Sequence, residues 1–218
     1  MNCTRKNLNV RGAPERMNNS YLTEEIKKRY NRTAIFYDMM DRMISDDLRR
    51  KALAEASGKV LEVGVGTGKN LQYYSAGCEV TGIDFSPGML AKAREKVHLA
   101  EVPVTLMEMD AEHMDFPDNA FDTVVATCVF CSVPHPVEGL KEVRRVCKDE
   151  GKIILLEHVR SENPILGKLM DLLNPVSLHI VGSNINRRTI ENVEKAGIGI
   201  RKVDNVFGKI VKLIIASK

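Results

Sequence analysis

A glycine-rich turn at positions 62–68, EVGVGTG, holds the residues best suited to chemistry. Its glycines permit a tight turn and let a ligand approach the backbone closely, and they are Gly64, Gly66 and Gly68. A dinucleotide-binding turn would read G-x-G-x-x-G, whereas here the third glycine comes two residues after the second. Glu62 stands next to the place of a pyrophosphate, where its charge repels phosphate but attracts an ammonium group. The turn therefore predicts a ligand with a positively charged end rather than a dinucleotide.

Two further carboxylates follow the next two apolar runs. Asp84 ends the run 79–84, and an acid at that strand end accepts hydrogen bonds from ribose hydroxyls in nucleotide sites. Asp110, followed by Ala111, ends the run 104–110, where a carboxylate can accept from the exocyclic amine of adenine. Ligands of open α/β sheets bind at the carboxyl ends of the strands. Three acids at three consecutive strand ends therefore predict a nucleoside site with room for a cation.

Apolar runs and helical stretches alternate along the part of the chain that must position these acids. The expected helices are 69–75, 86–98 and 136–148, and the expected strands are 59–65, 79–84, 104–110, 121–128 and 152–159. Such alternation is typical of βαβ units, which build a parallel sheet with helices on both faces. Two last runs, 200–206 and 209–216, predict a hairpin at the edge of the sheet. The expected fold class is α/β, with a Rossmann-like, mostly parallel sheet of seven strands and a C-terminal antiparallel hairpin.

We expect three parts along the chain. Residues 1–19 are polar and carry four basic side chains, which predicts a flexible basic arm. Residues 20–57 predict a helical cap, because apolar side chains recur there at four-residue spacing. Residues 58–218 form the predicted ligand-binding domain. Within it, residues 160–185 interrupt the alternation and predict an apolar lid of one or two short helices.

Composition narrows the class of protein. Hydrophobic residues make up 44% and charged residues 28%, the ordinary balance of a soluble globular protein. A net charge of +3 and an aromatic content of 5% argue against a nucleic-acid partner. No apolar stretch approaches the roughly 20 residues of a membrane span, and the polar N-terminus lacks the apolar core of a secretory signal. Five cysteines without a regular spacing predict reduced thiols and a cytoplasmic location.

Four segments carry a family resemblance: VLEVGVGTG, TGIDFSPGML, MDAEHMDFPDNAFD and EVRRVCKDEGKIILLEH. Through them, about residues 58–160 resemble class I S-adenosylmethionine-dependent methyltransferases. YNRTAIFYD at 30–38 and the NLQYY that follows the glycine turn are similar to the branch of quinone-biosynthesis and phosphatidylethanolamine N-methyltransferases. CVFCSVPHP is similar to membrane-associated thiol methyltransferase-like proteins. The resemblance implies S-adenosyl-L-methionine as the cofactor and residues 58–218 as the domain that binds it.

The resemblance also implies which residues hold the amino-acid end of that cofactor. Glu62, Gly64 and Gly66 would bind this end, and Gly68 would shape the turn. Thr127, near the end of the fourth expected strand, and the turn that follows it would lie under the methionine moiety.

A second group of residues would bind the nucleoside end of the cofactor. The resemblance implies that Asp84 binds the ribose hydroxyls and that Phe85 and Met89 pack against adenine. Asp110 and the backbone of Ala111 would read the adenine edge.

Candidate catalytic residues are fewer, and no nucleophile–base pair stands out. His135 lies just past the fourth expected strand and His158 just past the fifth, where each could reach a substrate. Either histidine, or Tyr37, is a candidate base or orienter for an amine or thiol acceptor. The resemblance implies that Tyr30 and Tyr37 cover the cofactor from the N-terminal helix.

Cys128 and Cys131 form a C-x-x-C pair. A zinc site would need a second pair, so no metal site is expected, and structural thiols are the favoured interpretation. Cys128 is the one that we expect near the cofactor.

Together these features predict an enzyme that moves a methyl group to a small-molecule or lipid acceptor. A phospholipid headgroup amine is favoured, because the basic arm, the amphipathic first helix and the apolar stretch 160–185 suit peripheral contact with a membrane. C-methylation of a quinone precursor and S-methylation of a small apolar thiol are the alternative reactions. A non-catalytic module that binds S-adenosylmethionine is the alternative of another class. The sequence fixes neither the acceptor atom nor the oligomeric state.

Overall fold

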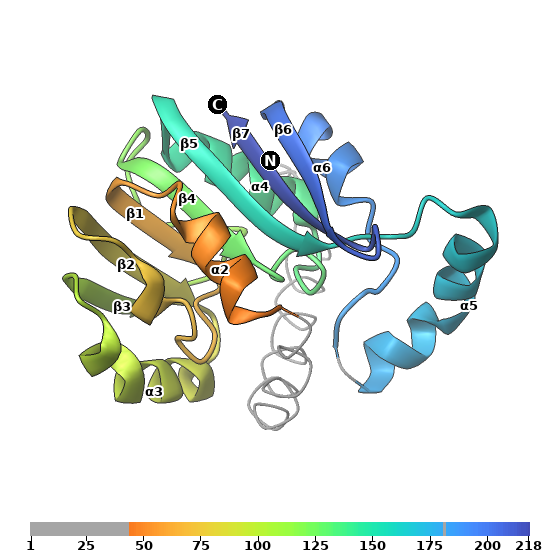
Figure 1. The fold of residues 1–218 in the computed structure, drawn as a ribbon, viewed down its shortest axis with the longest axis horizontal. Coiled ribbons are helices and arrows are strands. Elements are labelled where there is room, and N and C mark those ends of the chain that lie inside the picture. The colour runs from red at the N-terminus through yellow and green to blue at the C-terminus, as the bar shows by residue number, and fades with distance from the viewer. Residues whose placement is uncertain (1–43, 181) are drawn as a thin grey trace, which may run out of the picture.

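The computed structural model describes residues 44–180 and 182–218 (Figure 1). The predicted basic arm, most of the predicted helical cap, and the candidate residues Tyr30 and Tyr37 lie outside the described residues.

A seven-stranded sheet forms the centre of the molecule, with the strand order β3-β2-β1-β4-β5-β7-β6 (Figure 1). Five strands run parallel: β1 (Gly58–Val63), β2 (Cys78–Asp84), β3 (Val104–Glu108), β4 (Phe121–Thr127) and β5 (Cys147–His158). The hairpin β6 (Gly199–Phe207) and β7 (Val211–Ser217) completes the sheet, with β7 antiparallel to both β5 and β6. The predicted fold class is confirmed.

Helices α2 (Asp46–Leu53) and α3 (Pro87–Lys96) cover one face of this sheet, and α4 (Pro136–Val146) and α6 (Thr189–Lys195) cover the other. Helix α5 (Pro164–Ile180) lies outside these two layers (Figure 1). Side chains of β4 alternate between the two layers, as expected for a strand buried on both sides. Val124 and Ala126 join the apolar cluster with α4 and α6, whereas Val125 joins the cluster with α2 and α3.

Several helix ends follow directly from the sequence. The hydroxyls of Ser45 and Ser86 accept hydrogen bonds from the backbone N–H groups of Leu48 and Met89, which caps α2 and α3. Proline opens both α3 and α4, where its fixed φ and missing N–H are tolerated. These caps fix where each helix begins relative to the carboxyl edge of the sheet.

The helix expected over 69–75 is wrong, because a single 3-10 turn, Leu71–Tyr73, follows the glycine-rich turn. Tyr74 already has an extended backbone (φ −69°, ψ 130°), and its phenol reaches back to a buried carboxylate at the end of β1. The stretch is therefore ordered by side-chain hydrogen bonds, and the glycine-rich turn leads into a 3-10 turn instead of the expected helix.

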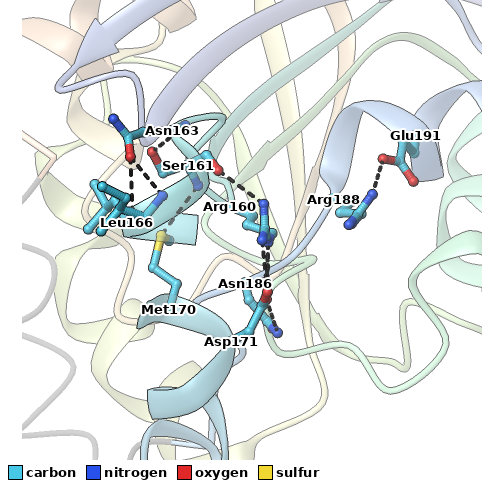
Figure 2. A network of polar contacts seen from close by, with 10 residues as sticks. Arg160, Ser161, Asn163, Leu166, Met170, Asp171, Asn186, Arg188 and Glu191 are labelled. Carbon is cyan, nitrogen blue, oxygen red and sulfur yellow. Dashed lines mark hydrogen bonds and ion pairs between the residues drawn. The ribbon is translucent and has the colours of Figure 1, made fainter. Parts of the chain in front are cut away.

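The lid expected at 160–185 contains one long helix, α5, of 17 residues. Asn163 caps it, because its Oδ1 accepts from the N–H groups of Ile165 and Leu166 (Figure 2). The helix projects away from the sheet beyond the β6–β7 hairpin (Figure 1). In residues 44–180 and 182–218, no helix has both the length and the apolar character that crossing a bilayer requires.

Candidate active site

A cavity of about 300 Å³ opens at the carboxyl edge of the parallel strands. It brings together ten of the residues that the sequence singled out: Glu62, Gly64, Gly66, Asp84, Phe85, Met89, Asp110, Ala111, Thr127 and His158. They come from the ends of β1, β2, β4 and β5, from the start of α3 and from the segment after β3. The expectation that these strand ends meet at one site is therefore met for the described residues.

The glycines of the turn differ in what they do. All three have positive φ, between +56° and +76°. A Cβ on Gly64 would lie 2.6 Å from Val129 Cγ2, and one on Gly68 would lie 3.0 Å from the backbone of Ala93. A Cβ on Gly66 would meet nothing closer than 3.9 Å. Gly64 and Gly68 are thus required by packing within the chain, whereas Gly66 leaves open space on the cavity side for a ligand to approach the backbone.

Glu62 is buried at the end of β1 and already has two partners. Its Oε1 accepts from Asn70 Nδ2 at 2.8 Å, and its Oε2 accepts from the phenol of Tyr74 at 2.9 Å. Burial raises the pKa of Glu62 to about 7, while the hydrogen bonds from Tyr74 and Asn70 and the charge of Arg49 oppose that rise. An ammonium group in the cavity would favour the carboxylate form.

Asn70 connects this carboxylate to the rest of the site. Its Oδ1 accepts from Arg49 Nη1 at 2.6 Å, and its Nδ2 also donates to the hydroxyl of Thr127 at 3.1 Å. The sequence analysis gave no role to Arg49, Asn70 or Tyr74. Asn70 and Tyr74 lie in the NLQYY segment that contributed to the resemblance, and this segment is the feature of the sequence that could have pointed to them.

Asp84 ties the end of β2 to the glycine-rich turn. Its Oδ2 accepts from the N–H of Gly66 at 3.0 Å, and its Oδ1 accepts from the N–H of Ser86 at 2.9 Å. Burial raises the pKa of Asp84 to about 6, and these two backbone hydrogen bonds act in the opposite direction. Each oxygen keeps a lone pair with which it can accept from a ribose hydroxyl.

The residues expected at adenine line the same cavity. Met89 is buried in the first turn of α3, and Phe85 lies between it and the end of β2. Asp110 accepts from the N–H of Glu112 at 2.9 Å, which fixes the turn that also presents Ala111. Apolar surface between two acids, beside an open glycine, fits a nucleoside that carries a charged amino acid. These residues would hold S-adenosylmethionine.

The loop after β4 closes the cavity on another side, and a buried carboxylate supports it. Glu157 Oε1 accepts from the N–H groups of Val129 and Phe130 at 2.9 and 3.3 Å. Its Oε2 is buried and has no hydrogen-bond partner among the described residues, and burial raises the pKa of Glu157 to about 7. The sequence analysis assigned Glu157 no role, because a carboxyl at a strand end does not reveal that the next loop folds over it.

Cys128 and Cys131 both line the cavity as free thiols. Cys128 has a φ of +54°, a left-handed conformation that places the turn directly after β4. Burial raises the pKa of Cys128 well above its ordinary value and that of Cys131 to about 12. Both are therefore protonated at neutral pH, which supports the expectation of structural thiols with Cys128 near the cofactor.

The two candidate histidines are separated by the structure. His158 is the last residue of β5 and lines the cavity, and burial lowers the pKa of its imidazole, which keeps it neutral near pH 7. The residues that line the cavity do not include His135, whose side chain is 44% exposed. The Nδ1 atom of His135 lies 3.0 Å from Oε2 of Glu112, and the backbone N–H of His135 donates to Oε1 of the same carboxylate. Of the two, His158 therefore lies in the cavity wall, and His135 precedes the first turn of α4.

Comparisons with known proteins relate the chain to methyltransferases. Residues 61–155 match the family model of a methyltransferase domain. A phosphatidylethanolamine N-methyltransferase from Cereibacter sphaeroides is 44% identical over 148 residues, which cover 65% of this chain and 72% of that protein. A thiol S-methyltransferase, TMT1B of Rattus norvegicus, is 34% identical over 63% of this chain and 58% of its own length. A demethylmenaquinone methyltransferase of Thermus thermophilus is 36% identical over 56% of this chain and 60% of its own length.

A solved structure supports the fold. A methyltransferase from Thermotoga maritima that depends on S-adenosylmethionine superimposes with a TM-score of 0.67 at 20% identity. The match covers 88% of this chain and 99% of that one.

Proposed function

Because the chain belongs to the S-adenosylmethionine-dependent methyltransferases, we propose that it methylates the amine of a phospholipid headgroup. The cofactor supplies a methyl group that is already activated by a positively charged sulfur. The protein therefore has to align the acceptor with that methyl group and remove a proton from an amine acceptor. Alignment of two bound reactants can lower a barrier by roughly 7–11 kcal/mol without a covalent intermediate.

Different parts of the cavity suit different parts of the cofactor and the acceptor, which supports this proposal. Asp84 and Asp110 would bind the nucleoside, and Glu62 with the backbone at Gly66 would bind the amino-acid end. The same cavity extends to residues 183–185, which directly follow the apolar helix α5. An acceptor with a small polar head and a long apolar body would find both surfaces next to each other.

His158 is the residue that we assign to the proton. An amine reacts only when its lone pair is free, so an ammonium headgroup must first be deprotonated. A neutral imidazole that lines the cavity can accept that proton, and its lowered pKa makes the neutral form available at pH 7. This half-buried, neutral histidine at the end of β5, in the wall of the cavity, is the observation that carries the proposal. The 44% identity to a phosphatidylethanolamine N-methyltransferase supports the same acceptor.

The test is a product assay with three acceptor classes. The purified chain is incubated with isotopically labelled S-adenosylmethionine and with phosphatidylethanolamine, a demethylated quinone precursor or a small apolar thiol. Mass spectrometry then identifies the methylated product. We expect mono-methylated headgroup from phosphatidylethanolamine, in short-chain monomers and in vesicles. Methylated quinone precursor or thiol without methylated lipid would replace the proposal by C- or S-methylation.

A binding measurement separates the non-catalytic alternative. Calorimetry measures the affinity for S-adenosylmethionine on the same preparation. A protein that binds the cofactor but forms no S-adenosylhomocysteine with any acceptor would be a binding module. Saturable binding together with turnover on lipid is the result expected here.

A further inference from the structure

Helix α5 is amphipathic, and its apolar side faces away from the body of the protein. Leucine, isoleucine and valine side chains form a stripe that spans roughly 120° of the helix circumference. The stripe consists of Ile165, Leu166, Leu169, Leu172, Leu173 and Val176, with exposed fractions from 42% to 82%. We call these six residues the α5 stripe. None of the described side chains of α5 belongs to either apolar cluster of the core.

Polar contacts hold the opposite side of α5 to the body of the protein. Asn174 accepts from the N–H of Ile185 at 2.9 Å and donates to Asn184 Oδ1 at 3.0 Å. The hydroxyl of Ser177 donates to the carbonyl oxygen of Ser183 at 3.0 Å. Because three of these partners line the cavity, the orientation of α5 is coupled directly to the cavity wall.

An ion pair near the start of α5 strengthens this attachment. Arg160 Nη2 lies 2.8 Å from Asp171 Oδ2, and Asn186 donates to the other oxygen of the same carboxylate (Figure 2). The α5 stripe is therefore held outward by specific contacts rather than exposed by fraying.

Charges near the stripe favour an anionic partner. The acidic side chain of α5, Asp171, is neutralised by Arg160, and Glu162 just before the helix pairs with Lys212 at 2.5 Å. Lys168 on α5 and Lys209 in the β6–β7 turn are exposed. Phe207, 53% exposed, adds an apolar side chain to the same turn. Apolar side chains flanked by lysines match the boundary between acyl chains and anionic headgroups.

We propose that the α5 stripe docks on the surface of an anionic phospholipid bilayer and brings headgroups to the mouth of the cavity. The inference rests on the proposed lipid acceptor, and it adds where the lipid is met. The β6–β7 turn lies at the carboxyl edge of the sheet, because β7 begins opposite the end of β5. Phe207 and Lys209 therefore reach the bilayer from the edge on which the cavity opens.

The chain offers a closely matched pair of variants. Leu169→Gln with Leu173→Gln removes two side chains of the stripe that are 48% and 46% exposed. Leu99→Gln with Met107→Gln removes two apolar side chains that are 45% and 38% exposed, after α3 and on the edge strand β3. Each variant replaces two partly exposed apolar side chains with glutamine, but only the first pair lies on α5.

Flotation with vesicles of phosphatidylcholine and phosphatidylglycerol measures docking without turnover. We expect the parent and the Leu99/Met107 variant to float, and the Leu169/Leu173 variant to lose roughly tenfold or more in partitioning. High salt should weaken flotation of the parent, because Lys168 and Lys209 meet anionic lipid. Equal flotation of both variants, or no flotation of the parent, would overturn the inference.

Turnover separates this inference from the proposed function. On monomeric short-chain phosphatidylethanolamine we expect all three proteins to be equally active, whereas in vesicles the Leu169/Leu173 variant alone should be slow. A parent that floats but methylates no lipid would refute the acceptor and leave the docking surface standing. A parent dimer that the Leu169/Leu173 change dissociates would assign the stripe to a second copy of the chain. A much lower unfolding temperature for that variant would assign the stripe to a cover within the chain, and either result would overturn membrane docking.

Discussion

The phenol of Tyr74 donates to Oε2 of Glu62 across 2.9 Å, inside the core and twelve residues further along the chain. This hydrogen bond holds the carboxylate at the end of β1 and stops the turn after the glycines from continuing as a helix. It makes the acid nearest the expected amino-acid end of the cofactor part of a buried polar cluster with Asn70 and Arg49.

Tyr74→Phe removes that donor and leaves the ring in place. We expect the pKa of Glu62 to rise above about 7, because the bond from Tyr74 lowers it. The free energy of unfolding should fall by roughly 1.5–3 kcal/mol at pH 8 and by less at pH 6, where Glu62 is protonated. Urea denaturation at both pH values measures this. Tyr73→Phe is the control, since this less buried neighbour shares a hydrogen bond with the exposed Asp46 and stacks under Arg50, and an equal loss there would contradict the assignment.

Stability should depend on pH through the buried acids of the site. The folded chain raises the pKa of Glu62 from 4.5 to about 7 and that of Asp84 from 3.8 to about 6. Between about pH 4.5 and 7 the folded state therefore binds more protons than the unfolded state. The free energy of unfolding then falls as the pH rises through this window.

The matched experiment is a urea series from pH 5 to 8 with the parent and Glu62→Gln. We expect the variant to show a shallower decline, because one of the raised carboxyls is gone. Acids whose pKa is lowered, such as Asp171 at about 2, act below this window and do not mask the effect. A parallel decline in both proteins would show that Glu62 is ionised at pH 5 in the folded state.

Asp84→Asn should weaken cofactor binding by at least about tenfold. The change removes the negative charge and leaves one amide oxygen where two carboxylate oxygens accepted, so only one of the N–H groups of Gly66 and Ser86 keeps its acceptor. Calorimetry with S-adenosylhomocysteine measures the affinity. Asp115→Asn, an exposed acid on the loop after β3, is the control. Unchanged affinity in a folded Asp84→Asn protein would remove the ribose role assigned to Asp84.

The mostly parallel sheet and the position of the three acids could be predicted from the sequence, and the physical reason is local. Alternating apolar runs and helices fix a parallel sheet, and an acid that ends such a run must lie at its carboxyl edge. Glu62, Asp84 and Asp110 therefore needed no knowledge of long-range contacts. The hydrogen-bond partners of Glu62 could not be predicted in this way. Periodicity shows which residues are apolar, but it does not show which phenol or amide reaches a buried oxygen.

The apolar stretch 160–185 shows the other limit. Its composition predicted an apolar lid, but a helix with apolar residues can turn either side toward the body. The direction of α5 is decided by Asn174, Ser177 and Asp171, whose partners lie 15 or fewer residues away and belong to loops without periodicity. Polar side chains that hold a helix by its polar face leave no hydrophobic pattern that sequence reasoning could detect.

His158→Gln should lower kcat by roughly 100-fold or more and leave the cofactor affinity unchanged, because an amine acceptor then lacks its base. His135→Gln, which changes a histidine outside the residues that line the cavity, should stay near the parent. In the parent, kcat should fall as the pH drops below the lowered pKa of His158, since the protonated imidazole cannot accept a proton. Steady-state kinetics on short-chain lipid tests both points. A variant with the pH profile of the parent would exclude His158 as the base.

Glu157 offers a test of how the loop after β4 is held. Glu157→Ala leaves the buried N–H groups of Val129 and Phe130 without an acceptor, which should cost roughly 1–3 kcal/mol for each group. Glu157→Gln keeps a carbonyl oxygen for both donors and removes only the charge. Because the pKa of Glu157 is raised to about 7, its charge is already weakened, and the glutamine variant should unfold at nearly the urea concentration of the parent. Cofactor affinity should follow the same order, since Cys128 and Val129 line the cavity. Equal damage from both substitutions would mean that the negative charge, rather than the two hydrogen bonds, holds this wall of the site.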